Sequence, residues 1–80
     1  MKVVLKHEVN RVKNGYSARS PQLGLRAVGY SPETARLNLE RMALLYLKPF
    51  ERQGRLDEEV AAAQLESKAD EGDLIVVLTE

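Results

Sequence analysis

The chain opens with a stretch in which apolar and polar side chains alternate. Every second residue falls on one face of an extended chain, and these residues are Val3, Leu5, His7 and Val9. A period of two with β-branched residues predicts a strand over 2–9. The polar segment 10–14 ends in the turn dipeptide Asn14-Gly15, so we expect a hairpin with its second strand over 15–20. A two-residue type I′ turn and a longer loop both suit this dipeptide, and they give different registers.

A short third strand is predicted over 25–29. The segment before it contains Pro21 and Gly24, which favour a loop because proline fixes one backbone angle and glycine permits a positive one. The strand ends at Gly29. We therefore expect three antiparallel strands.

A helix is predicted to follow from Ser31. The Ser31 hydroxyl can cap the helix, Pro32 suits its first position and Glu33 favours the positive end of the helix dipole. Its apolar stripe is wide, with Ala35, Leu39, Met42 and Tyr46 in one row and Leu37, Leu44 and Leu45 beside it. Three short strands cannot cover so broad a face. We therefore expect the helix to contact a second copy of the chain or a partner.

The rest of the chain leaves two questions open. Pro49 either kinks the helix or ends it near Leu47, and Gly54 terminates it. High helix propensity and an acidic first turn predict a second helix over 57–68, although a strand over 60–68 competes with it. After a turn at 70–73, the continuous apolar run 74–78 predicts a final strand in a central, covered position.

These elements predict the α+β class, with one domain over residues 1–80. We expect a three-stranded antiparallel sheet, a helix packed on one face, a second short helix and a C-terminal strand. The chain contains no cysteine, which excludes disulfides, a thiol nucleophile and cysteine-based zinc sites. No apolar run approaches the length of a membrane span, and the N-terminal apolar stretch is too short for a signal peptide. We therefore expect a cytoplasmic protein without a membrane partner.

Charge is unevenly distributed along a chain whose formal net charge is zero. Residues 1–30 carry six Lys/Arg and one Glu, or +5, whereas residues 57–80 carry one Lys and eight Asp/Glu, or −7. Such asymmetry is typical of a basic binding surface with an acidic tail. The plainer interpretation is that the two ends lie close in the fold and neutralise each other.

Several short motifs, in order, resemble the HicB antitoxin family. They are Gly15-Tyr16 on the second strand, the loop Pro21-Gln22-Leu23-Gly24, Gly29, the helix start Ser31-Pro32-Glu33-Thr34-Ala35, Asn38, Leu45-Tyr46-Leu47 and Gly54. The resemblance covers about residues 2–54. The chain departs from the family pattern at Pro49, where the family's helix continues, and in the acidic, alanine-rich stretch 57–73.

The resemblance implies a truncated ribonuclease-H-like fold and a non-catalytic protein-binding role. Members of the family neutralise HicA, a small messenger-RNA-cleaving toxin, and associate as dimers or larger assemblies. The resemblance implies a HicA-like partner here and a homo-oligomer, in agreement with the wide apolar face of the helix. We expect the partner or oligomer interface at Tyr16, Arg19, Leu37, Leu44 and Leu45. The family's two-domain members add a C-terminal DNA-binding module, which we do not expect in this chain.

Catalytic chemistry is not expected from the residues. Ribonuclease H activity needs several carboxylates on two metal ions, and the first three strands hold only Glu8. The turn 70–73 could hold Ca²⁺ or Mg²⁺ loosely, but a solvated turn is the plainer interpretation. His7 has no nucleophile partner in a known motif, so we expect it to be packed. No glycine-rich phosphate loop is present, and we expect neither a metal nor another cofactor.

The alternative function is nucleic-acid binding by the basic N-terminal strands. The candidate phosphate contacts are Lys6, Arg11, Lys13, Arg19 and Arg26. Aromatic residues that could stack on bases are few among them, with only Tyr16 and Tyr30 nearby. A charged, half-exposed sheet face that deters edge-to-edge pairing explains the same residues.

Overall fold

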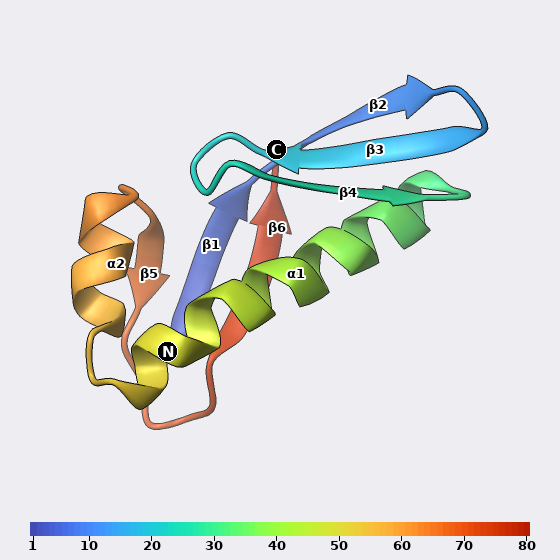
Figure 1. Ribbon diagram of the computed structural model, residues 1–80. Coiled ribbons are helices and arrows are strands. Elements are labelled where there is room, and N and C mark those ends of the chain that lie inside the picture. Colours follow the sequence, from blue (N-terminus) through green and yellow to red (C-terminus); the bar gives the residue numbers. More distant parts are fainter.

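The computed structural model describes residues 1–80 as six strands and two helices (Figure 1). The elements are β1 (Lys2–Lys6), β2 (Glu8–Val12), β3 (Gly15–Ser20), β4 (Leu25–Gly29), α1 (Pro32–Arg52), α2 (Leu56–Ala62), β5 (Glu66–Lys68) and β6 (Ile75–Thr79). The α+β class is confirmed. The second and third predicted strands match β3 and β4. The first predicted strand is divided into two strands, β1 and β2.

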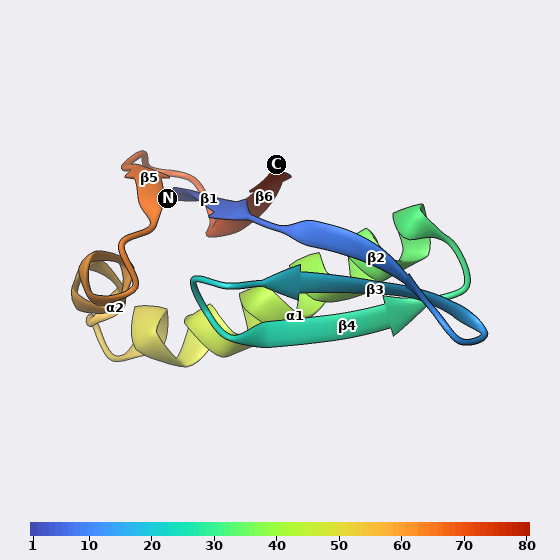
Figure 2. The same cartoon turned by 90° about the horizontal axis from the view of Figure 1, so that it is seen from above.

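The first predicted strand divides at His7 because its halves belong to different sheets. One sheet has the order β5-β1-β6 and the other has the order β2-β3-β4, so the expected single sheet is a pair of three-stranded sheets. The backbone N–H of His7 donates to the Thr79 carbonyl, after which the chain leaves β6 and pairs with β3. Figure 2 shows β1 and β2 as one continuous run that passes from one sheet to the other.

The hairpin between β2 and β3 has a two-residue loop. β2 extends through Val12, which pairs with Gly15, so the expected polar loop over 10–14 shrinks to Lys13 and Asn14. Only Asn14 has a positive φ, of 68°, which excludes the type I′ turn because that turn needs two positive φ values. Gly15 lies in the strand, where a Cβ atom would stand 2.6 Å from the Gly29 carbonyl oxygen.

Helix α1 lies across one face of both sheets and forms two hydrophobic clusters with them (Figures 1 and 2). Ala35 and Leu39 pack on Ala18 and Ala27 of the β2-β3-β4 sheet. The larger cluster contains Val3, Leu5, Ala43, Leu47, Leu56, Val60, Leu65, Leu74 and Val76. The buried row of α1 is therefore Ala35, Leu39, Ala43 and Leu47. Met42 and Tyr46, which we placed in the central row, are each 37% exposed.

Pro49 neither ends nor shortens α1, which continues to Arg52. Proline lacks an N–H, so the carbonyl of Leu45, four residues earlier, loses its helical donor. Leu45 lies on the exposed side of α1, where water can replace that donor. Gly54 follows the helix with a φ of +69°, as its role as terminator predicts.

The second helix is shorter than predicted. α2 ends at Ala62, and a positive φ of 56° at Gln64 turns the chain so that Leu65 becomes buried. The last part of the predicted helix is instead β5, which pairs antiparallel with β1. Each of the two competing predictions for this stretch is thus correct for one part of it. Neither helix is long and apolar enough to cross a membrane.

Strand β6 forms where expected, but it lies at a sheet edge rather than in the centre. It pairs in parallel with β1 only, and its other edge has no neighbouring strand. Leu74 and Val76 are buried in the core, whereas Ile75 and Val77 lie on the solvent side, 50% and 37% exposed. The run 74–78 is therefore apolar on both faces, although only one of them is buried.

Candidate interaction surfaces

Helix α1 has an apolar flank that no other element covers. Leu37, Met42 and Leu45 are exposed, and Leu45 retains 73% of its accessible surface. Leu44 differs from them, because it packs on the larger hydrophobic cluster and is half-buried. Of the three leucines predicted to contact a partner, Leu37 and Leu45 are therefore free and Leu44 contributes to the core.

The other two predicted interface residues do not join this flank. Tyr16 is half-buried against the alanine cluster that α1 covers. Arg19 lies on the opposite face of the sheet, next to Ser17 in the alternation, and its Nη2 forms an ion pair of 3.2 Å with Glu8 Oε2. The predicted interface thus divides between two faces of the molecule.

The five basic residues proposed as phosphate contacts also divide. Arg19 stands opposite Arg26 in the β3–β4 register, on the face that α1 leaves open, and Lys6 lies on the same side of the continuous β1–β2 chain. Arg26 Nε donates to Ser17 Oγ over 2.7 Å. Arg11 stands opposite Tyr16 on the face turned toward α1, and Lys13 lies in the turn. Lys6, Arg19 and Arg26 therefore point to the same face of the continuous β1–β2 chain and its partner strands.

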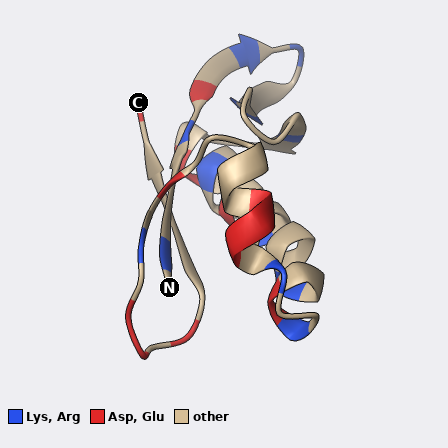
Figure 3. Ribbon diagram, turned by 90° about the vertical axis from the view of Figure 1, so that its left-hand side faces the viewer, with Lys and Arg blue, Asp and Glu red and all other residues tan.

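An acidic surface gathers at the opposite end of the molecule. We use this name for Asp57, Glu58, Glu66, Asp70, Glu71 and Asp73, which lie in the first turn of α2, on β5 and in the β5–β6 loop. Figure 3, viewed from the end of the molecule where α2 and this loop lie, shows them as two separate acidic segments.

The acidic surface keeps most of its charge. Glu58 pairs with Arg55, and Asp70 pairs with the Met1 amino group over 3.0 Å. The donation from that amino group, followed by the donation from the Gly72 N–H, holds the pKa of Asp70 below its ordinary value. No other ion pair joins the basic N-terminal third to the acidic C-terminal third. The prediction that the two ends lie close in the fold is confirmed, since β1 lies between β5 and β6, and Met1 and Asp70 form the single ion pair between them. The carboxylates that stay without a partner were not predicted.

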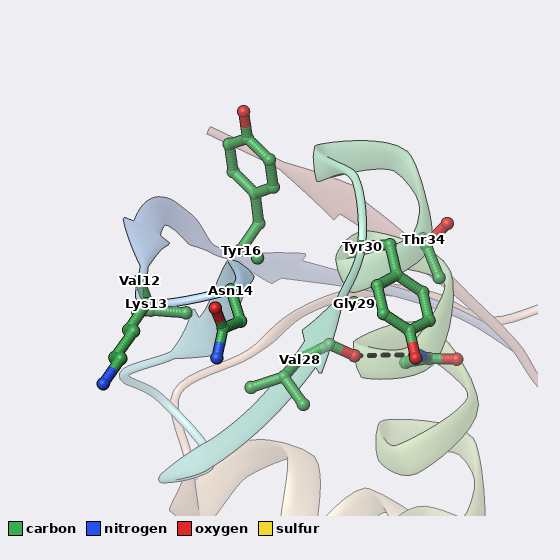
Figure 4. A pocket seen from close by; sticks show the side chains of 10 residues that line it. Val12, Lys13, Asn14, Tyr16, Val28, Gly29, Tyr30 and Thr34 are labelled. Carbon is green, nitrogen blue, oxygen red and sulfur yellow. Dashed lines mark hydrogen bonds between the residues drawn. The ribbon is translucent and has the colours of Figure 1, made fainter.

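A pocket of about 370 Å³ lies between the β2–β3 turn and the start of α1. Its lining includes Tyr16, Tyr30 and Asn38, whose Nδ2 donates to the Val28 carbonyl over 2.8 Å. Figure 4 shows the two tyrosine rings pointing in different directions, and Tyr30 is 92% exposed. The two rings therefore do not form a stacking platform for a base.

His7 is buried, as predicted, at the point where β1 becomes β2. Its Nδ1 lies 2.8 Å from the Thr79 carbonyl oxygen, and Arg36 Nε donates to its Nε2 over 3.1 Å. Because Arg36 can only donate, Nε2 accepts, and the ring proton is assigned to Nδ1. Both ring nitrogens thus hold the last strand and the helix in place. A second cavity, of about 430 Å³, opens beside His7, Glu8 and Arg36.

The carboxylates do not converge. No three His, Asp or Glu side chains lie close enough together to hold a metal ion. Compared with protein-family models, with curated proteins and with solved structures, the chain matches none. The resemblance to the HicB family therefore rests on the short sequence motifs within residues 2–54 alone. Function is inferred from the surfaces described above.

Proposed function

We propose that the protein is a non-catalytic binding module of the HicB antitoxin type, which neutralises a small RNA-cleaving protein by covering its RNA-binding surface. The element order supports this proposal. Three antiparallel strands, β2, β3 and β4, precede the long helix, and β6 then runs beside β1. A truncated ribonuclease-H-like domain, as the resemblance implies, has the same succession of strands, helix and further strand.

The acidic surface is the observation that carries the proposal. A protein that cleaves RNA must bind a polyanion, so its substrate surface is basic. A partner that covers such a surface needs carboxylates that are not already paired, since complementary charge speeds and orients association. Glu66, Glu71 and Asp73 meet this need, because they are exposed and form no ion pair or side-chain hydrogen bond.

The apolar flank of α1 can supply the binding affinity that charge alone does not provide. Charged residues at the rim of an interface mainly steer the encounter, whereas buried apolar anchors provide most of the affinity. Leu45 and Met42 are exposed and lie one turn apart on α1. We propose that the toxin contacts both surfaces.

The test is recovery of the partner from native cells and assay of its activity. Tagged protein is purified from its own cell extract, a co-purifying small basic protein is separated, and RNA cleavage is measured with and without added chain. We expect cleavage that stops at about one chain per toxin. The variant E66Q/E71Q/D73N should lose this inhibition, and the matched control E33Q/E40Q/E51Q, which removes three charges from α1, should keep it.

Two outcomes would contradict the proposal. One is an unchanged inhibition by E66Q/E71Q/D73N. The other is RNA in place of a protein partner, bound with an affinity that falls steeply with salt and that depends on Lys6, Arg19 and Arg26. The second outcome would establish the alternative function, nucleic-acid binding by the outer sheet face.

A further inference from the structure

The outer edge of β6 is a sheet edge without protection. Exposed edges are normally blunted by short length, by charged side chains or by groups that cover them. The opposite edge of the same sheet is β5, which has three residues and contains Glu66 and Lys68. β6, with the sequence IVVLT, has five residues and no charge. This edge is therefore open to a further strand.

The open edge presents backbone groups at two positions. In the parallel ladder with β1, the Ile75 N–H and the Thr79 carbonyl both bond toward the β1 side of β6. Residues of such a ladder face the neighbouring strand alternately. Val76 and Leu78 therefore turn their N–H and C=O groups to the other side, where no strand of the chain pairs with them.

Helix α1 packs over β6 and extends past its open edge (Figures 1 and 2). Arg36 and Glu80 line one cavity, so this side of α1 faces the end of β6. Leu44 lies on the same side, because residues four apart share a face of a helix. Leu44 and Leu78 are both only half-buried. A further strand in this sheet would lie beneath α1, as β6 does, and would cover both leucines.

The two ends of β6 carry carboxylates without partners. Asp73 lies two residues before the strand and Glu80 follows it directly, and neither forms an ion pair or a side-chain hydrogen bond. The cavity of about 430 Å³ opens at the Glu80 end. Its one cation, Arg36, donates to His7 rather than to Glu80. The open edge is thus apolar along its length and acidic at both ends.

We infer that β6 binds an extended segment of the protein's partner as a further strand of its sheet. The segment pairs its backbone with Val76 and Leu78. One face of the segment lies beneath α1, and the other lies beside Ile75 and Val77, which are 50% and 37% exposed. Main-chain hydrogen bonds provide the affinity of such strand addition, and alternate side chains provide its specificity.

The chemistry of the edge defines the segment that fits it. About five uncharged, β-branched or apolar residues match the length of β6, and Lys or Arg on both sides of them match the carboxylates at its ends. The identity of the partner rests on the proposed function, since a protein that binds RNA is basic and can supply such a segment.

Amide hydrogen exchange of the purified chain tests the site without the partner. The probe is the synthetic peptide Ac-KRTVTVTRK-NH2, in which β-branched residues stand between basic pairs. At saturating peptide, the N–H groups of Val76 and Leu78 should exchange at least about tenfold more slowly, because they become hydrogen-bonded. The matched acidic peptide Ac-EETVTVTEE-NH2 should give no protection. No protection by the basic peptide, or equal protection by both peptides, would overturn the inference.

Two substitutions at Leu78 give a measurement on the partner itself. L78A and L78P both remove the leucine side chain, but only L78P also removes the outward N–H. An edge strand tolerates proline where its N–H faces solvent, and thermal unfolding checks that both variants are folded. L78P should inhibit the RNA-cleaving partner at least about tenfold more weakly than L78A, since a partner carbonyl loses its donor. Equal inhibition by the two variants would overturn the inference.

Failure of the inference and failure of the proposed function are distinguishable. If no RNA-cleaving partner is recovered, the proposed function fails, and the peptide still decides whether β6 accepts a strand. If the chain inhibits such a partner but the basic peptide does not protect Val76 and Leu78, the inference fails alone.

Discussion

The end of β4 lies directly against the start of α1, at Gly29 and Ala35. A Cβ atom on Gly29 would stand 2.5 Å from the Ala35 backbone nitrogen. No side chain fits between the two backbones. This close approach lets Ala35 and Leu39 reach the small residues Ala18 and Ala27, and it sets how near α1 sits to the β2-β3-β4 sheet.

Gly29→Ala should therefore destabilise the protein. Backbone atoms cannot move aside as a flexible side chain can, so the helix must shift, and overpacking of this kind costs about 1–3 kcal/mol. Denaturant unfolding measures the change. Gly72→Ala is the matched control, since the nearest atom to a Cβ there is at an ordinary 3.4 Å. Equal stability of the two variants would show that α1 does not pack against β4 as described.

Leu47→Ala and Leu45→Ala should differ strongly although they are two residues apart. Leu47 is fully buried in the larger cluster, so its truncation should cost about 2–5 kcal/mol. Leu45 is largely exposed, and its truncation should change the free energy of unfolding by no more than about 0.5 kcal/mol. Thermal or denaturant unfolding of dilute protein checks both values. A large loss of stability in Leu45→Ala, without one in Leu47→Ala, would show that the side of α1 described as exposed is the buried side.

This pair also shows where sequence reasoning succeeded and where it failed. The strand and helix positions followed from period and turn residues, and β3, β4 and the start of α1 were predicted closely. The buried row of α1 was not, because Met42 and Tyr46 look more hydrophobic than Ala43. Ala43 is buried because it lies on the same side of α1 as Ala35, Leu39 and Leu47, the side that meets the sheets. Which side of a helix meets a sheet is a tertiary property that hydrophobicity alone does not give.

The long-range pairings were out of reach for the same reason. Period two predicts strand over 2–9 but does not say that its halves join different sheets at His7. An apolar run such as 74–78 suits a central strand and an unprotected edge strand equally well. For the candidate site, exposure of Leu37 and Leu45 followed from the width of the helix stripe. The acidic surface could not be predicted, because the sequence does not show which carboxylates form ion pairs and which stay free.

Tyr46 should titrate above its ordinary pKa, which is near 10. Its hydroxyl donates to Glu59 Oε1 over 3.0 Å, and this hydrogen bond, followed by burial and the charge of Glu59, raises the pKa of Tyr46. Protonated Tyr46 is therefore favoured in the folded chain. The bond stabilises the protein below about pH 10, and this contribution is lost as the pH rises through the raised pKa.

Tyr46→Phe removes the hydrogen bond by which Tyr46 of α1 contacts Glu59 of α2. It should lower the free energy of unfolding at neutral pH by about 0.5–1 kcal/mol, as expected for one exposed hydrogen bond. The difference from wild type should shrink in strong alkali. Tyr30→Phe is the control, because Tyr30 is exposed and its hydroxyl has no hydrogen-bond partner in the chain. An equal effect of both substitutions, or a Tyr46 absorbance titration at the ordinary pH, would contradict the bond.

Asp70 should make folding more favourable at neutral pH than in acid. Its pKa in the folded chain lies below the ordinary value of 3.8, chiefly because the Met1 amino group donates to it. The stabilisation is complete above the ordinary pKa and is lost as the pH falls through the lowered one. Unfolding of Asp70→Asn across this pH range should show a deficit at neutral pH that closes in acid.

Asp73→Asn serves as the control for Asp70. Asp73 lies in the same loop and forms no ion pair. Its substitution should leave the pH dependence of stability close to that of the wild type. A deficit in Asp70→Asn that is constant with pH would show that the carboxylate charge is not what stabilises the loop.

The pairing of β1 with β6 also determines when this protein can finish folding. The β2–β3 hairpin and α1 join residues close in sequence, and they can form early. β1 must wait until the ribosome has delivered β6, more than 70 residues later, because β1 lies between β5 and β6. At about 5–20 residues per second, this wait lasts about 4–15 s. For that time in every round of synthesis, Val3 and Leu5 of the nascent chain have no native strand beside them, and a chaperone or a neighbouring chain can reach them first.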